Sequence, residues 1–246
     1  MLLEGDRPLR FEPFGEDTCE LIGTIEHSFR VKFTEDELNC AWTLGTMGQI
    51  IFKKLKHPVG ARCLNAITFY RLRRTFMELF GTPRIKMSPA TSLCELMPWK
   101  TRKKQWRSIQ DHLDYILPKL MWPVWLLVIA LVFTGSALYF LFGLAPLRAM
   151  GSVSVLAGIV GFVALLVPVC FVLNPVAREF PSVCVTLGDL TKLILARNYG
   201  QIAARHGMSS EKEVIQSLVV LVAEETAIDI AKLSPDTRFP EDLGIS

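Results

Sequence analysis

Two long stretches without a charged side chain constrain what this chain can fold into. One runs from Leu120 to Leu147 and the other from Ala149 to Ala177. Each is longer than the ~20 apolar residues that cross a bilayer as a helix. The sequence therefore predicts a two-helix transmembrane hairpin at 118–177, with spans at about 121–143 and 152–174. A hairpin buried inside a globular protein is the alternative.

Positive side chains flank the predicted hairpin on one side. They are Lys100, Arg102, Lys103, Lys104 and Arg107 before the first span and Arg178 after the second. The positive-inside rule then predicts a multi-pass, bacterial-type inner-membrane protein with both termini in the cytoplasm. Anionic lipids of the bilayer are the partner that this basic segment predicts. The first residues lack the apolar core of a signal peptide, so none is expected.

The predicted spans contain no ionisable residue, which argues against a transporter or a proton relay. Small residues at Ser154, Gly158 and Gly161 predict close helix packing. This packing occurs either within the hairpin or between protomers, and the sequence leaves both open. A small oligomeric channel built from the hairpin is therefore one alternative function.

A Thr-Leu-Gly motif occurs twice outside the uncharged stretches. It lies in "WTLGTMGQIIFKKL" (42–55) and in "VTLGDLTKLILARN" (185–198). In both copies apolar residues recur at the spacing of one helical face, and the threonine stands where a helix N-cap is expected. The sequence predicts two related helices, capped by Thr43 and Thr186.

A second motif, Ser-Pro-x-Thr, is also repeated. It lies in "MSPATSLCEL" (87–96) and in "LSPDTRFPEDL" (233–243). Each copy follows an amphipathic stretch, at about 63–80 and from about 211, and the second stretch opens with a capping box from Ser210 to Glu213. Proline and threonine are expected to fix a turn in each copy.

The order of these motifs predicts an all-α protein with two related helical bundles and the hairpin. One bundle is interrupted: its first part spans 58–117, with a helix at about 100–117, and its last helix lies in 178–200. The other bundle is split, with its first half at 207–246 and its second half at 1–57, including a helix at about 17–29. The segment 196–212 separates the copies.

The strings Glu-Asp-Leu-Gly (241–244) and Thr-Leu-Gly-Asp-Leu (186–190), in this helical order, resemble the acyl carrier proteins. The resemblance covers nearly all of the chain outside the hairpin and implies the carrier fold. It also implies a phosphopantetheine arm on a serine at the start of the second helix. The matching positions here are Gly15 and the neighbourhood of Lys100, so no cofactor is expected. Only Ser246 would carry an arm, in an alternative membrane-tethered acyl or peptidyl carrier.

The charges on the two second helices differ. Glu16, Asp17 and Glu20 make the split copy acidic, as in carrier proteins, whereas Lys100 to Arg107 make the interrupted copy basic. The basic helix of one protomer is therefore a candidate to dock on the acidic helix of another. A purely topogenic role of the basic segment is the alternative. The turn Asp242, Leu243 and Gly244 is expected to lie at the junction of the split halves.

The split copy has three possible ways to close, because a half-domain of this size cannot bury an adequate core. Its halves can meet within one chain as a circular permutant, between neighbouring chains in a ring or filament, or on a different protein. The sequence does not choose among them.

The six cysteines and four histidines have neither metal-site spacing nor catalytic partners. Basic residues without interleaved aromatic side chains also make nucleic acid an unexpected partner. The sequence predicts no enzyme. It predicts a non-catalytic, membrane-anchored, carrier-like scaffold or interaction protein that self-associates through its split domain as a homo-oligomer.

Overall fold

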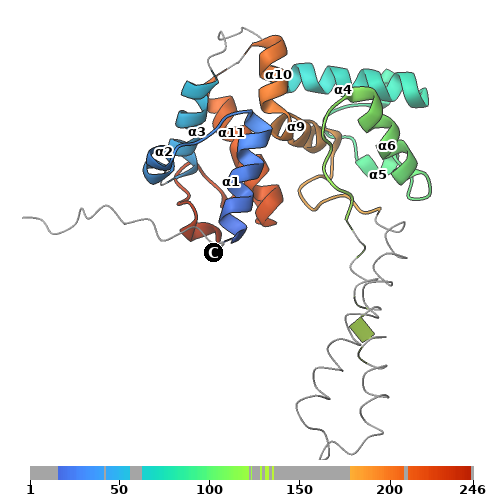
Figure 1. The fold of residues 1–246 in the computed structure, drawn as a ribbon. Helices are drawn as coiled ribbons and strands as arrows, with labels where there is room; N and C mark the ends of the chain where they lie inside the picture. The colour runs from blue at the N-terminus through green and yellow to red at the C-terminus, as the bar shows by residue number, and fades with distance from the viewer. Residues whose placement is uncertain are drawn as a thin grey trace, which may run out of the picture. The chain divides into compact units, whose positions relative to one another are not determined.

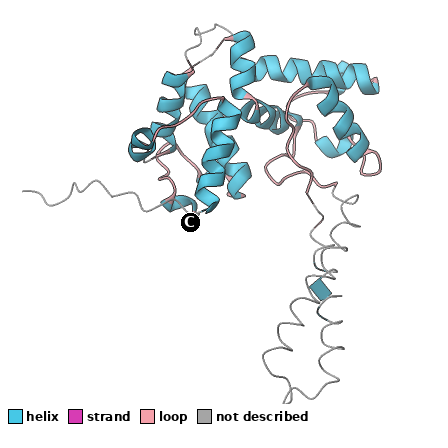
Figure 2. Ribbon diagram, in the orientation of Figure 1, coloured by secondary structure: helices cyan, strands magenta, loops and turns pink. Residues whose placement is uncertain are grey.

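The computed structural model of the 246-residue chain is helical (Figures 1 and 2). It describes residues 16–41, 43–55, 63–121, 123, 128, 131–132, 135, 178–207 and 210–244. Over these residues there is no strand, and β pairing is confined to three isolated bridges. The prediction of an all-α protein is confirmed at this level.

The chain divides into two compact units. Unit 1 comprises residues 1–98, 105–118 and 182–246, and unit 2 comprises residues 99–104 and 119–181. Unit 1 contains two subdomains, each formed from segments that are separated in the sequence. The split subdomain joins an N-terminal and a C-terminal segment, and the interrupted subdomain joins segments on either side of residues 119–181.

The split subdomain contains three helices from the N-terminal segment, α1 (Glu16–Phe29), α2 (Glu35–Cys40) and α3 (Leu44–Lys54). Its C-terminal segment contributes α11 (Glu211–Thr226) and the short 3-10 helices η4 (Ile230–Lys232) and η5 (Glu241–Leu243). α11 packs against α3 and α1 of the same chain, as Figure 1 shows. In this structure the two segments of the split subdomain therefore meet within one chain.

Apolar side chains at helical spacing fill the core between these segments. On α3 the buried face is Leu44, Met47 and Ile51, as the Thr-Leu-Gly pattern predicts. On α11 the buried residues include Val214 and Leu218, which are fully covered. Each segment alone would leave its face in water, so burial drives the distant segments together.

The interrupted subdomain contains α4 (Leu64–Phe80), η1 (Arg84–Lys86), α5 (Leu93–Leu96), α6 (Arg102–Leu113) and α9 (Leu187–Arg197). α4 packs on α9, and α9 packs in turn on α11 of the split subdomain. Trp106, Ile109 and Leu113 of α6 are buried, three and four residues apart, as expected for one helix face. The Trp106 indole N–H donates to the carbonyl of Pro118 at 3.1 Å.

Part of the segment that the sequence predicts to separate the two copies forms a helix of its own. α10 (Tyr199–His206) packs against α1, α4 and α9. Tyr199, Ile202 and Ala203 are fully buried, and the Tyr199 ring lies 5.2 Å from that of Phe29. The spacing of these three residues carries the helical signal that the sequence analysis did not use.

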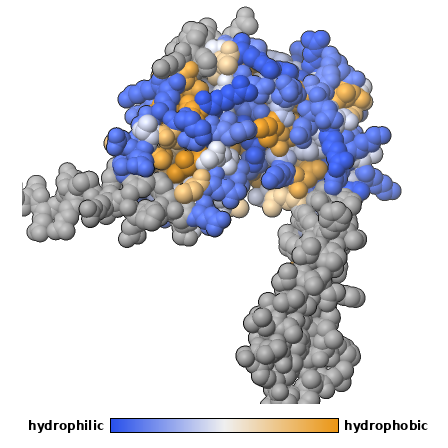
Figure 3. Space-filling view, in the orientation of Figure 1, coloured by the Kyte–Doolittle hydropathy of each residue, from blue (hydrophilic) through white to orange (hydrophobic). Residues whose placement is uncertain are grey.

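The surface of unit 1 is mostly hydrophilic in the view of Figure 3, with apolar residues in small separate patches. Ile85 is the most exposed of the large apolar side chains in the described residues, at 94%. Isolated apolar residues of this kind are ordinary on a folded surface.

Unit 2 is described only near its ends. Met121 and Glu179 form an antiparallel bridge with N···O distances of 2.8 and 3.1 Å. Arg102 donates to the carbonyl of Arg178 at 2.7 Å, and its guanidinium lies 4.2 Å from the ring centre of Phe180. These contacts bring together the two ends of the segment that the sequence predicts to be a hairpin.

The membrane prediction is contradicted by the helices of the structure. Among the described residues no helix is long and apolar enough to cross a bilayer. The longest of them, α4, has 17 residues and carries Arg71, Arg73, Arg74 and Glu78, whereas a span needs about 20 mostly apolar residues. The assignments as a membrane protein with transmembrane helices, as a multi-pass inner-membrane protein and as one with a cytoplasmic side are corrected accordingly.

Much of the predicted hairpin falls on residues outside the described ranges. This holds for most of the span at 121–143, for all of the span at 152–174, and for Ser154, Gly158 and Gly161. Gly15 and Ser246 also lie outside the described residues.

Candidate functional site

The two Ser-Pro-x-Thr loops hold the two Thr-Leu-Gly helices in the same way. At the start of α3 the amide of Leu44 donates to Thr237 at 3.0 Å, and that of Gly45 donates to Pro235 at 2.7 Å. At the start of α9 the amide of Leu187 donates to Thr91 at 2.9 Å. Gly188 donates to Pro89 at 2.8 Å. Each loop thus accepts two N–H groups that a helix start leaves without an intrahelical partner.

The glycine of each motif permits this close approach. A Cβ built on Gly45 would lie 2.9 Å from the carbonyl oxygen of Pro235, and one on Gly188 would lie 2.9 Å from that of Pro89. These separations are too short for a side chain, because the obstacle is backbone. In both subdomains, glycine is therefore required in Thr-Leu-Gly because a side chain would collide with the backbone of the loop.

The predicted N-caps are confirmed for both helices. The Thr43 hydroxyl accepts from the amide of Thr46, and the Thr186 hydroxyl accepts from that of Asp189. In each case the side chain of the later residue accepts a hydrogen bond from the backbone amide of the threonine. Both starts are complete capping boxes.

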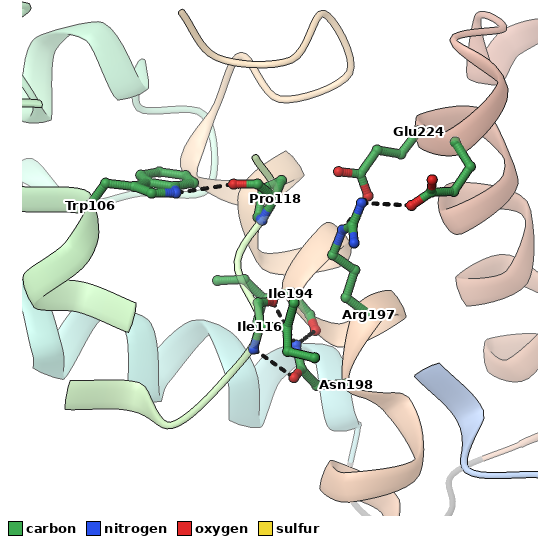
Figure 4. Close-up of polar contacts among 8 residues, drawn as sticks. Trp106, Ile116, Pro118, Ile194, Arg197, Asn198 and Glu224 are labelled. Atoms are coloured by element: carbon green, nitrogen blue, oxygen red, sulfur yellow. Dashed lines mark hydrogen bonds and ion pairs between the residues drawn. The ribbon is translucent and has the colours of Figure 1, made fainter. Parts of the chain in front are cut away.

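Polar side chains at the C-terminal end of α9 join three segments of unit 1 (Figure 4). The Asn198 amide accepts from the Ile116 N–H at 2.8 Å and donates to the Ile116 carbonyl at 2.9 Å. Arg197 pairs with Glu224 and Glu225 of α11, at 2.7 Å each. Burial raises the pKa of Glu224, and Arg197 opposes that rise. Arg197 therefore connects the interrupted subdomain to the split subdomain, and Asn198 connects the end of α9 to the segment that follows α6.

The acidic residues predicted for docking lie on the surface. Glu16, Asp17 and Glu20 of α1 are all exposed. They stand in the first turns of the helix, where negative charge is favourable. Their side chains are therefore accessible to a basic partner.

The basic residues predicted for docking are not equivalent. Lys100, Lys104 and Arg107 are exposed, and Lys103 is half-buried. Arg102 is only 6% exposed, and it stacks on Phe180 and on Trp99. The prediction that Arg102 is an interaction residue conflicts with this burial, because its guanidinium is occupied inside unit 2.

The turn at the end of the described chain has local structural roles. The Asp242 carboxylate accepts from the amide of Arg238 at 2.8 Å, and Leu243 is buried. Gly244 ends η5 with a φ of 64°, in the left-handed region that glycine adopts most readily. Leu243 is buried, whereas Asp242 and Gly244 are exposed, so the prediction that this turn takes part in an interaction stays a prediction.

A pocket of about 770 Å³ lies between α11, η4, α9 and the start of α4. Its lining includes Ile215, Val219, Ile230, Leu233, Lys192, Glu211, Glu213 and Asn65. Its volume lies within the range of about 300–1,000 Å³ that is common for small-molecule sites. The sequence does not predict this pocket, because its walls come from segments far apart in the chain.

Glu213 is the unusual residue of this pocket. The predicted capping box is only half formed: Ser210 accepts from the amide of Glu213, but the Glu213 carboxylate is directed to α4. Its Oε1 accepts from the amide of Asn65 at 3.3 Å and from the Cys63 thiol at 3.7 Å. The carboxylate therefore caps the start of α4, a helix far from Glu213 in the sequence.

Two side-chain oxygens of residues in this lining have no hydrogen-bond partner among the described residues. They are Oε2 of Glu213 and Oδ1 of Asn65, and both are buried. A buried polar atom without a partner costs about 1–3 kcal/mol. Burial also raises the pKa of Glu213, and the bonds from Asn65 and Cys63 oppose that rise.

Within the described residues, no three His, Cys, Asp or Glu side chains gather as a metal site would require. Burial of Cys184 raises the pKa of its thiol strongly. This thiol is a core residue and is not placed to react.

The resemblance to the acyl carrier proteins stays a prediction from the sequence motifs. No protein-family model, no curated protein and no solved structure matches this chain.

Proposed function

We propose that this protein is a non-catalytic interaction protein built from two carrier-like helical subdomains, one of them circularly permuted. The observation that supports it best is the equivalent docking of the two loops on α3 and α9. In both, a capped threonine is followed by two amides that bond to the loop. Paired motifs that make paired contacts favour an origin of the two subdomains in one ancestral unit.

The absence of a serine at the predicted attachment positions supports a non-catalytic role. Gly15 and Lys100 stand at or near the positions where a carrier protein has its serine. Lys100 is exposed, but an amine cannot form the phosphodiester that anchors the arm. The carrier framework would then be used for contacts between proteins and not for acyl transfer.

Incubation with a phosphopantetheinyl transferase and coenzyme A tests this part of the proposal. The intact mass of the full chain is expected to stay unchanged. A genuine acyl carrier protein in the same reaction is the positive control. An added arm on any serine would contradict the proposal and support an active carrier.

Self-association is the interaction that the charges favour. Glu16, Asp17 and Glu20 expose an acidic face on α1, and the exposed cations Lys104 and Arg107 lie on α6. Opposite charges on two faces of one protein allow one copy to dock head-to-tail on the next. Closure of the split subdomain within one chain leaves no need for exchange of halves between copies.

Sedimentation velocity of the variant Glu16→Lys/Asp17→Lys/Glu20→Lys tests the docking. Self-association is expected to weaken by about tenfold or more, and added salt is expected to weaken that of the unmodified protein. The matched control is Glu35→Lys/Asp36→Lys, which reverses two exposed charges on α2. Unmodified protein that sediments as a monomer at every concentration would show this proposal to be wrong.

A further inference from the structure

The outer face of α4 exposes side chains of the kinds that bind other proteins. Tyr70 is 57% exposed and Met77 is 42% exposed. The Arg73 guanidinium lies 4.8 Å from the centre of the Tyr70 ring, and among the described residues no carboxylate pairs with it. Tyrosine, methionine and arginine are enriched at protein interfaces. This face is therefore a candidate contact surface.

Four residues of α4 form one stripe along this face. They are Ala66, Tyr70, Arg73 and Met77, which follow one another at intervals of four, three and four positions. Residues three and four apart are neighbours on a helix surface. Leu72, which is fully buried, belongs to the opposite face. The core therefore uses the other side of α4, and Tyr70 and Met77 remain accessible to a partner.

The first helix, α1, carries an exposed stripe at the same spacing. Its residues are Glu16, Glu20, Gly23 and His27. Gly23 stands in the interior of the helix, where glycine is less favourable than alanine. Nothing lies within 4 Å of a Cβ built on it. Packing within the chain therefore does not require this glycine, whereas a large side chain of another molecule would fit against it.

The two stripes are complementary when the helices run antiparallel. The pairs are then Glu20 with Arg73, Gly23 with Tyr70, Glu16 with Met77 and His27 with Ala66. Opposite charges meet at one position, and a large side chain meets a small residue at another. In the parallel order Arg73 would face Gly23 and Glu20 would face Tyr70, so neither charge would have a partner.

We infer that α1 of one copy packs antiparallel on the outer face of α4 of the next copy, where Glu20 pairs with Arg73. This inference rests on the proposed self-association and names the surface that receives α1. The cations Lys104 and Arg107 then add long-range attraction, because α6 exposes no large apolar side chain that could anchor a helix.

Sedimentation velocity of charge-exchange variants of the full chain tests the inference. Arg73→Glu and Glu20→Arg are each expected to weaken self-association about tenfold or more, and the double variant is expected to recover most of it. The matched control is Arg107→Glu, an exposed cation of α6, with an expected loss of about threefold or less. No recovery in the double variant, or an equal loss in the control, overturns the inference.

The same measurement separates this inference from the proposed function. If Glu16→Lys/Asp17→Lys/Glu20→Lys weakens self-association while Arg73→Glu leaves it unchanged, the proposed self-association stands and α4 is not the receiving surface. Unmodified protein that stays a monomer at every concentration overturns both.

Two further variants keep the test decisive if Arg73→Glu fails to fold. Gly23→Gln is expected to weaken self-association about tenfold, because the added side chain keeps Tyr70 away from α1. Its thermal unfolding midpoint should stay unchanged or rise, since glycine leaves a helix interior. Tyr70→Ala is expected to weaken self-association about tenfold as well, and Ile85→Ala, an exposed apolar residue outside the stripe, is its matched control. Unchanged self-association of either stripe variant, or an equal loss in Ile85→Ala, overturns the inference.

Discussion

The starts of α3 and α9 make the same contacts although the chain reaches them differently. At α9 the partner loop precedes the helix in the sequence, whereas at α3 the partner loop comes last, after α11. The four amide bonds to the loops nevertheless lie between 2.7 and 3.0 Å. The contact is therefore specified by the residues of the motif and the loop, and the order of the segments matters little to it.

The two starts differ in the residue that completes the capping box. At α3 it is the hydroxyl of Thr46, and at α9 it is the carboxylate of Asp189, 2.8 Å from the Thr186 hydroxyl. A carboxylate in the first turn also interacts favourably with the positive end of the helix dipole. The start of α9 is accordingly expected to be the stronger of the two.

Removal of residues 233–246 is expected to have the largest effect, because it deletes the loop from the split subdomain alone. Phe239 and Leu243 are buried, and Leu44 and Gly45 would lose their acceptors. The loss is expected to be about 5 kcal/mol or more, comparable with the whole stability of many domains. Urea denaturation followed by circular dichroism measures it. A peptide of the deleted residues, added back, should restore part of the stability, and an unchanged midpoint would contradict the pairing.

Arg197→Met is expected to cause the second-largest loss of stability, because it removes the ion pairs between α9 and α11. The Glu224 side chain is only 7% exposed and would lose its cation, at a cost of about 3 kcal/mol. The pKa of Glu224 is already raised by burial and would rise further. An acid with a raised pKa in the folded state destabilises increasingly as the pH rises through that pKa.

The deficit of Arg197→Met is therefore expected to be largest at neutral pH and to shrink as the pH falls toward the ordinary pKa of a glutamate. Urea unfolding at several pH values measures it. The double variant Arg197→Met/Glu224→Gln is the control, and its pH dependence should be flatter. A deficit that grows as the pH falls would contradict this assignment.

Gly45→Ala and Gly188→Ala test whether the two loop contacts are sterically equivalent. A Cβ at either position meets a proline carbonyl oxygen, so each variant is expected to lose about 1–3 kcal/mol. Gly23→Ala on α1 is the matched control, because nothing lies within 4 Å of its added Cβ. That control should gain about 0.5–1 kcal/mol as glycine leaves a helix interior. Thermal unfolding checks all three, and a neutral result at only one loop would break the equivalence.

Thr43→Ala and Thr186→Ala are expected to show the smallest effects, of about 1 kcal/mol each. Thr186→Ala should cost more, because it leaves the Asp189 carboxylate with fewer partners. Chemical denaturation of both variants gives the difference. Reversed order of the two losses would show that the carboxylate does not strengthen the start of α9.

Much of the helical framework could be predicted from the sequence because its signals are local. The sequence patterns of α3 and α9 are short. The caps at Thr43 and Thr186 and the apolar faces each depend on residues within one or two helical turns. The repeated motifs also assigned each loop and each helix to one of two bundles, but the hydrogen bonds between loop and helix were not predicted. Closure within one chain was left open, since neither motif depends on whether its partner lies in the same molecule.

The side chains that act between distant segments could not be predicted in this way. Glu213 has the spacing of a capping box with Ser210, yet its carboxylate bonds to Asn65. Arg102 belongs to a basic run that indicated a surface, yet it is buried against Phe180. The placement of these two side chains depends on which distant element packs beside them, and a single sequence does not predict that packing. The membrane assignment is contradicted as well, since no helix among the described residues is long and apolar enough to cross a bilayer.

The pairing of α3 with α11 also has a consequence for the order of events during translation. A ribosome makes α3 early, but α11 emerges only after the whole interrupted subdomain. At ~5–20 residues per second the delay is on the order of ten seconds or more. During that interval Leu44, Met47 and Ile51 have no α11 to cover them. The core of the split subdomain is thus completed only when its last-made helix arrives, long after α3 has been synthesised.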